Sequence, residues 1–173
     1  MRIVAGQWKG RRLVVPGGSA VRPTSDRVRE AWMSIVQPWL PDARVLDLFA
    51  GSGALGIEAV SRGAAHADLV ESAAESLRAI EQNVAAVQGA ALLQVHRADA
   101  IRFVQTLEPH AYDVAFADPP YDLGLAAQVA ARWLDTPFAD LLGVEHRAFE
   151  KMPDGGDRRK YGGSAITFYR LTE

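Results

Sequence analysis

The chain has 173 residues, of which 49% are hydrophobic and 23% are charged, with a formal net charge of -2 at pH 7 and no cysteine. This length and composition suit one globular core, and the lack of cysteine excludes disulfides, thiolate metal sites and cysteine nucleophiles. No apolar run reaches the roughly 20 residues of a membrane span, and the N-terminus lacks the apolar core of a signal peptide. We therefore expect a cytoplasmic protein without a membrane partner.

The first predicted elements are a hairpin and a helix. Short apolar runs at residues 2–5 and 12–15 surround a glycine-bounded turn and predict an N-terminal β-hairpin. A helix should follow, with Thr24 or Ser25 as its N-cap, because apolar residues recur at helical spacing as far as Val36.

From residue 44 onward, strand-like and helix-like patterns alternate. Strands are expected at residues 45–49, 67–71, 92–96 and 112–117, and helices at residues 54–62, 73–88, 100–107 and 123–134. This alternation predicts an α/β fold with a doubly wound, Rossmann-like sheet, mainly parallel and ordered 3-2-1-4-5. Two later strands, at residues 144–150 and 165–171, predict an antiparallel C-terminal hairpin because no helix fits between them.

A glycine-rich loop follows the first strand of this sheet. Gly51, Gly53 and Gly56 have the G-x-G-x-x-G spacing, and Glu71 ends the next strand twenty residues after Gly51. In this strand–loop–helix context, the glycines approach a nucleotide and the acid holds ribose hydroxyls. The pattern favours a nucleoside-containing cofactor, while the alternative is a turn that only packs the helix on the strand.

Asp47 separates the candidate cofactors. A carboxylate just before the glycines would repel a dinucleotide's pyrophosphate and attract the ammonium and sulfonium of S-adenosylmethionine. Asp99 follows the third strand, where it either reads the adenine amino group or caps the next helix. The residues expected to bind S-adenosyl-L-methionine are Asp47, Phe49, Gly51, Ser52, Gly53, Glu71, Asp99 and Ala100.

Asp118, Pro119, Pro120 and Tyr121 follow the fourth strand, at the edge of the sheet where ligands bind. The prolines remove backbone donors and leave carbonyls as acceptors, while the tyrosine ring offers a stacking surface. Because strands one and four are neighbours in the expected order, this tetrad should face the glycine loop. We expect its four residues to hold a planar amine for methyl transfer. The tetrad itself leaves adenine, cytosine, guanine and glutamine open.

At these residues the chain resembles known enzymes. The tetrad is similar to the [DNS]-P-P-[YFW] motif of amino-group methyltransferases that use S-adenosylmethionine. The block Arg22-Pro-Thr-Ser-Asp-Arg-Val-Arg-Glu30, after the segment from Arg2 to Arg12, resembles the RsmD family. The resemblance implies a class I methyltransferase that modifies the N2 amine of one guanine in 16S ribosomal RNA of the small ribosomal subunit. It also implies that Glu71 holds the ribose, that Asp99 lies near the adenine, and that the tetrad surrounds the guanine.

The N-terminal region is strongly basic. Between Met1 and Arg29, seven arginines and lysines accompany one acid, Asp26. Such a local excess is compatible with phosphate binding, although a solvated surface is the alternative. The expected RNA-binding residues are Arg2, Lys9, Arg11, Arg12, Arg22 and Arg27. We expect residues 1–43 to form a substrate-contacting extension and residues 44–173 to form the methyltransferase domain of a monomer.

Rival functions remain open at this point. The same tetrad serves enzymes that methylate adenine N6 or cytosine N4 in DNA, other RNA amines, or a glutamine amide of a protein. A non-catalytic RNA-binding assembly factor with a retained cofactor fold is a further alternative. Near the C-terminus, Arg158, Arg159 and Lys160 are interpreted as a solvated turn rather than a phosphate contact.

Overall fold

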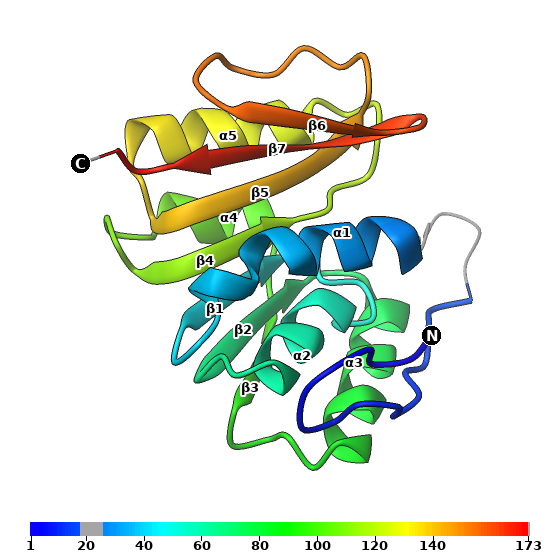
Figure 1. The fold of residues 1–173 in the computed structure, drawn as a ribbon. Coiled ribbons are helices and arrows are strands. Elements are labelled where there is room, and N and C mark those ends of the chain that lie inside the picture. Colours follow the sequence, from blue (N-terminus) through cyan, green and yellow to red (C-terminus); the bar gives the residue numbers. More distant parts are fainter. Residues whose placement is uncertain (18–25, 173) are drawn as a thin grey trace.

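The computed structural model describes residues 1–17 and 26–172, which form one seven-stranded sheet with helices on both faces (Figure 1). The strands are β1 Arg44–Leu48, β2 His66–Glu71, β3 Leu93–Arg97, β4 Tyr112–Ala117, β5 Ala139–Arg147, β6 Asp157–Tyr161 and β7 Ser164–Arg170. The helices are α1 Asp26–Val36, the short 3-10 helix Gln37–Trp39, α2 Ala54–Ser61, α3 Ala74–Ala86, α4 Ala100–Gln105 and α5 Leu125–Asp135. The predicted caps Thr24 and Ser25 lie outside the described residues.

The strands lie in the order β3-β2-β1-β4-β5-β7-β6. The first five are parallel, whereas β7 is antiparallel to both β5 and β6. One hydrophobic cluster joins the sheet to α1, α2 and α3, and a second joins its other face to α4 and α5. The predicted doubly wound α/β sheet, its 3-2-1-4-5 order and its antiparallel C-terminal hairpin are confirmed.

The C-terminal third differs from the prediction in detail. Strand β5 runs from Ala139 to Arg147, so the expected strand at residues 144–150 was placed too late along the chain. The solvated turn expected at residues 158–160 is wrong, since these residues lie in β6, an exposed edge strand. Charged side chains are common on edge strands because they discourage pairing with other chains, and they hide the apolar alternation that marks a strand.

The N-terminal hairpin is reduced to one antiparallel bridge between Arg2 and Arg12, without strands. Around this bridge the Ile3 and Leu13 amides donate to the carbonyls of Arg11 and Met1 at 3.0 and 2.9 Å. The next amides, of Val4 and Ala5, donate to the buried Glu58 carboxylate of α2 at 2.8 and 3.1 Å. The side chains of Ile3, Trp8 and Leu13 join the core described above. This segment is therefore packed against the sheet domain rather than extended as a free arm.

Asn83 of α3 fixes the end of this segment. Its side-chain amide nitrogen donates to the carbonyl of Val14 at 2.9 Å and to that of Ser52 at 2.8 Å, while its oxygen accepts from the Val14 amide at 2.7 Å. One buried side chain thus ties the N-terminal segment to the loop that follows β1. Buried polar groups that are fully paired in this way make a local structure specific.

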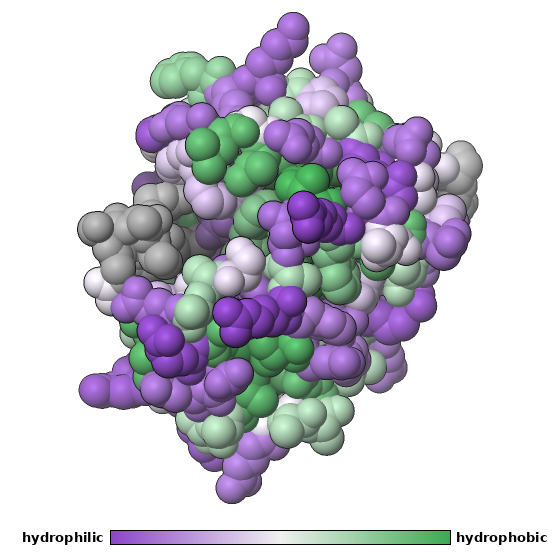
Figure 2. Space-filling view, turned by 180° about the vertical axis from the view of Figure 1, so that it is seen from behind, coloured by the Kyte–Doolittle hydropathy of each residue, from purple (hydrophilic) through white to green (hydrophobic). Residues whose placement is uncertain are grey.

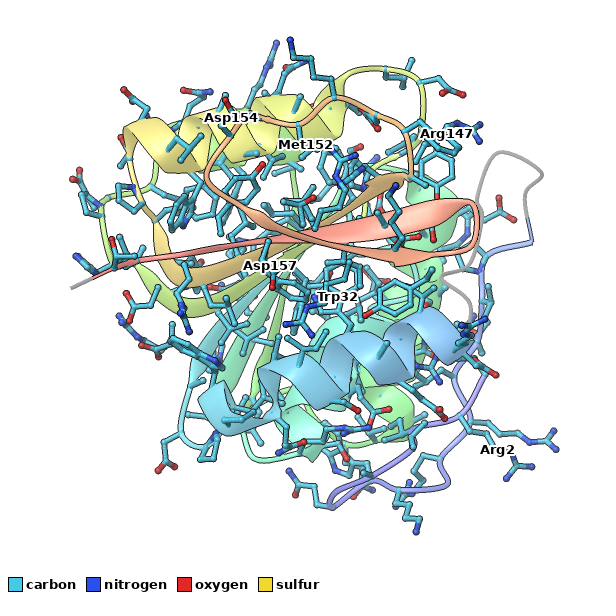
Figure 3. All side chains as sticks on the ribbon, turned by 45° about the horizontal axis from the view of Figure 1, so that its top comes forward. Arg2, Trp32, Arg147, Met152, Asp154 and Asp157 are labelled. Carbon is cyan, nitrogen blue, oxygen red and sulfur yellow. The ribbon has the colours of Figure 1, made fainter. Side chains whose placement is uncertain are left out.

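Helix α1 is held on the sheet through Trp32, which is fully buried (Figure 3). Its ring meets Phe116 of β4 edge-on, with 5.6 Å between ring centroids and an 82° angle between ring planes. Gly143 of β5 makes room for the same indole, because a Cβ at this position would lie 2.6 Å from the Trp32 Nε1 atom. The helix can approach the sheet this closely only over a glycine.

The surface seen from behind is mostly hydrophilic, as expected for a protein whose hydrophobic clusters are internal (Figure 2). On this face, hydrophilic residues surround separate hydrophobic patches. In the described part of the chain, none of the helices has the length and hydrophobicity needed to cross a lipid bilayer.

The substitution Gly143→Ala should destabilise the protein by about 1–3 kcal/mol, because the added methyl group overpacks a rigid buried indole. Urea unfolding of the wild type and the variant measures this difference. Gly163→Ala is the matched control, since a Cβ at Gly163 meets nothing within 4 Å. Equal unfolding free energies for the two variants would contradict the proposed packing.

Candidate functional site

A cavity of about 570 Å³ opens at the carboxyl ends of the parallel strands. Most of the residues predicted for cofactor and substrate line it: Asp47, Phe49, Gly51, Ser52, Glu71, Asp99, Asp118, Pro119, Pro120 and Tyr121. Gly53 and Ala100 are not among the lining residues; they are the N-cap of α2 and the first residue of α4. Motifs that are far apart in the sequence therefore meet around one space.

The loop after β1 is shaped by left-handed backbone. Gly51 and Gly53 have φ angles of 59° and 80°, which glycine adopts without strain. A Cβ at Gly56 would collide with the side chain of Leu69 on β2, so this glycine lets α2 pack closely on the sheet. Packing therefore explains Gly56, whereas Gly51 turns the loop and lines the cavity.

Glu71 braces this loop from the end of β2. One carboxylate oxygen accepts a hydrogen bond from the Gly51 amide at 2.9 Å, and the other accepts from the amides of Ser72 and Ala73 at 2.8 and 2.9 Å. A carboxylate has about four lone-pair positions, so these three bonds leave room for a further donor on the cavity side. The side chain is thus fixed in place before any ligand binds.

Asp47 lies beneath the loop with only 1% of its surface exposed. Burial raises the pKa of its carboxyl group, a hydrogen bond from the Gly56 amide at 2.9 Å opposes this shift, and the nearby Glu71 charge adds to it, so that the pKa is about 8. A proton therefore occupies this group at neutral pH, and a cation in the cavity would favour the charged carboxylate. The site suits a positively charged ligand and disfavours a pyrophosphate.

Asp99 has the structural role that sequence analysis left open. Its carboxylate accepts a hydrogen bond from the Arg102 amide at 2.9 Å and so caps α4. The same residue lines the cavity. Its contact with an adenine stays a prediction, which the cap does not oppose because a carboxylate accepts several donors.

The tetrad leaves the sheet beside the glycine loop. Strands β1 and β4 pair in parallel with Leu48 opposite Ala117, and the Asp118 amide donates to the Leu48 carbonyl at 3.4 Å. The next three residues, two prolines and Tyr121, continue along the cavity wall. The two motifs are therefore adjacent, as the predicted strand order requires.

Two side chains of β5 hold the Tyr121 ring, and sequence analysis missed both. The tyrosine hydroxyl donates to the buried Glu145 carboxylate at 3.2 Å, and the Arg147 guanidinium lies 4.6 Å from the ring centroid. Arg147 is itself fixed by two hydrogen bonds to Asp122, at 2.8 and 2.9 Å. The position of these residues at the carboxyl end of a strand next to β4 was the signal that could have revealed them.

The predicted RNA-binding residues lie outside the cavity. Arg2, Lys9, Arg11, Arg12 and Arg27 are all exposed, and Arg2 points outward (Figure 3). Arg11 also donates to the carbonyl of Ala86 at 3.0 Å, which anchors the segment on α3. Arg22 lies outside the described residues. One further basic residue of this region, Arg29, is buried and lines the cavity, which sequence analysis did not anticipate.

Comparison with known proteins finds similarity along nearly the whole chain. The protein-family model described as conserved hypothetical protein 95 matches residues 1–170. Ribosomal RNA small subunit methyltransferase D of Escherichia coli K12 is 44% identical over 126 residues, which cover 72% of this chain and 62% of that protein. The chain thus spans about three fifths of the length of this relative.

Two solved structures show the same fold. A hypothetical protein of Thermus thermophilus is 32% identical with a TM-score of 0.83, and the match covers 99% of both chains. A 16S rRNA N2 G1207 methyltransferase of the same organism, solved with AdoMet and guanosine, is 21% identical with a TM-score of 0.67. That match covers 91% of this chain and 45% of the other, and at this identity it shows a common fold.

The raised pKa of Asp47 predicts a pH dependence of stability. Between pH 4 and pH 8 the unfolded carboxyl is ionised while the buried one keeps its proton, so raising the pH costs the folded state up to about 1.4 kcal/mol per unit. Asp47→Asn keeps an acceptor for Gly56 but carries no proton to lose. The wild type should therefore lose stability relative to this variant as the pH rises from 5 to 8.

Urea unfolding at four pH values in this range measures the difference. Asp122→Asn is the control, because Arg147 lowers the pKa of Asp122 and its effect should be nearly constant above pH 5. A pH-independent difference between the wild type and Asp47→Asn would show that Asp47 is ionised in the folded protein.

Proposed function

The chain belongs to the conserved hypothetical protein 95 family, the RsmD family that its motifs resemble, and on this premise we propose that it methylates the N2 amine of a guanine in 16S ribosomal RNA with S-adenosylmethionine as donor. The observation that carries the proposal is that the glycine loop and the tetrad line one cavity from adjacent strands. We further propose that it acts as a monomer on the small ribosomal subunit in the cytoplasm.

The residues of the cavity fit S-adenosylmethionine. Glu71 is fixed where it can accept from ribose hydroxyls, and Asp47 and Asp118 add acidic character that suits an ammonium and a sulfonium. When bound, the cofactor supplies an electrophilic methyl group. The protein contributes proximity and orientation: it holds the methyl donor at the end of β1, beside the tetrad that follows β4.

The tetrad supplies acceptors for the amine that is methylated. The Asp118 carboxylate and the Pro119 carbonyl can accept the two amine hydrogens, which stabilises positive charge as the new bond forms. The following Tyr121 ring offers a surface for an extruded base, because a base within a helix is out of reach of the cavity. Glu145 and Arg147 keep that ring oriented.

The name of the E. coli relative supports ribosomal RNA as the substrate, since that protein is a small subunit rRNA methyltransferase. The exposed basic side chains of the N-terminal segment, including Lys9 and Arg12, can bind the phosphates of such a substrate. We propose that this segment contacts RNA around the mouth of the cavity while the tetrad selects the amine.

Labelled S-adenosylmethionine tests the function directly. The protein is incubated with naked 16S rRNA, with assembled small subunits and with duplex DNA, and the labelled nucleosides are identified by mass spectrometry. We expect N2-methylguanosine at one position of 16S rRNA. Methylated adenine or cytosine would show that guanine is not the base that is modified. Cofactor binding without any methyl transfer would favour a non-catalytic assembly factor.

Asp118→Ala should lower the rate of methyl transfer by about 100-fold or more, because it removes a charged acceptor from the reacting amine. Its affinity for S-adenosylhomocysteine, measured by calorimetry, should stay within a few-fold of the wild type. Asp135→Ala, an exposed acid of α5, is the control for a lost surface charge. Full activity of Asp118→Ala would overturn the role given to the tetrad.

A further inference from the structure

Arg29 of α1 lines the cavity although only 3% of its side chain is exposed. Its Nη2 atom donates to the carbonyl of Arg2 at 2.9 Å and lies 3.5 Å from the carboxylate of Asp26, which is itself largely exposed. Its Nε and Nη1 atoms are buried and have no hydrogen-bond partner among the residues that the structure describes. These residues thus meet only part of the hydrogen-bonding capacity of the guanidinium.

An arginine side chain stays charged in folded proteins, so the charge of Arg29 must be accommodated where it lies. A buried charge with unmet donors is destabilising, and such groups are rare in folded proteins unless a ligand completes their bonding. The bond to the Arg2 carbonyl explains how the side chain is anchored. It does not explain why the remaining donors are enclosed beside a cavity.

The charges around the cavity indicate what the ligand group is. Among the described residues that line it, Arg29 is the one cationic side chain. The acidic side chains there are Glu71, Asp99, Asp118 and Asp47, of which Asp47 keeps its proton at neutral pH until a cation favours its charged form. A fitting ligand therefore carries positive charge over most of its length and one negative group at the end near Arg29. S-adenosylmethionine has this pattern, with a sulfonium, an ammonium and one α-carboxylate.

The position of Arg29 agrees with this orientation. It precedes Trp32 by one turn on the same face of α1, and Trp32 packs on Phe116 of β4. Glu71, by contrast, ends β2, on the other side of β1. A cofactor whose ribose lies at Glu71 and whose methionine portion extends past β1 would bring its carboxylate to Arg29.

We propose that Arg29 binds the α-carboxylate of S-adenosylmethionine through donors that the described residues leave unpaired, an assignment that rests on the proposed function. An RNA phosphate is the other anion that an arginine could bind. The burial of Arg29 beneath the carbonyl of Arg2 disfavours it, because a polynucleotide backbone cannot follow the side chain inside. The exposed arginines of the same region suit that role better.

The test compares two ligands that differ in the proposed group. S-adenosylhomocysteine carries the carboxylate, whereas 5′-deoxy-5′-methylthioadenosine keeps the adenosine and the sulfur but lacks the amino-acid portion. Calorimetry of Arg29→Gln should show about 10- to 100-fold weaker binding of the first ligand and less than about 3-fold change for the second, since only a buried charge pair is lost. Arg29→Lys should fall between, and Arg170→Gln, at an exposed arginine of β7 that does not line the cavity, should match the wild type.

Each other outcome counts against the assignment. Equal weakening of both ligands would make Arg29 a structural residue, and unchanged cofactor affinity with weaker RNA binding would assign it to a phosphate. If Arg29→Gln does not fold, the wild type is tested instead with S-adenosylhomocysteine and with its carboxamide, which lacks the negative charge. The carboxamide should then bind about 10- to 100-fold more weakly than S-adenosylhomocysteine. Failure of the wild type to bind S-adenosylhomocysteine at all would instead overturn the proposed function.

Discussion

Strands β1 and β4 pair in parallel with Leu48 opposite Ala117, so both chains leave the sheet at the same level and on the same edge. The glycine loop follows one strand and the tetrad follows the other, so the backbone pairing of the two strands brings the motifs together. The ends of β2 and β5 lie at the same edge, where Glu71 lines the cavity and the exposed Arg147 lies against the Tyr121 ring. The chemistry of the cavity is therefore a consequence of strand order.

Polar anchors hold the N-terminal segment, whose residues Met1, Val15 and Pro16 line the cavity. Glu58 and Asn83 pair with the backbone of the N-terminal segment, and Asn83 also bonds to Ser52 in the glycine loop. Trp32 holds α1 against β4 in the same region. The position of Arg29 depends on these contacts, because its side chain bonds to the segment while its backbone belongs to the helix. The same contacts therefore position both the N-terminal segment that lines the cavity and the Arg29 guanidinium.

The parts of the site that sequence analysis found are those encoded locally. A strand followed by glycines, and a strand followed by Asp118 and two prolines, are recognisable because each element and its functional residues are contiguous. The residues that it missed are defined by burial. Arg29 stands among several similar arginines, and only its packing against Arg2 distinguishes it from exposed Arg27. Strand β6 was missed because an exposed, charged edge strand has no apolar alternation.

A crystal structure of the protein with S-adenosylhomocysteine is the decisive measurement, because it would show directly where the ribose, the sulfur and the carboxylate of the ligand lie. We expect the ribose hydroxyls at Glu71, the sulfur beside Asp118 at the junction of β1 and β4, and the carboxylate at Arg29. A ligand bound outside this cavity, or bound in it with the carboxylate turned toward Glu71, would contradict the account.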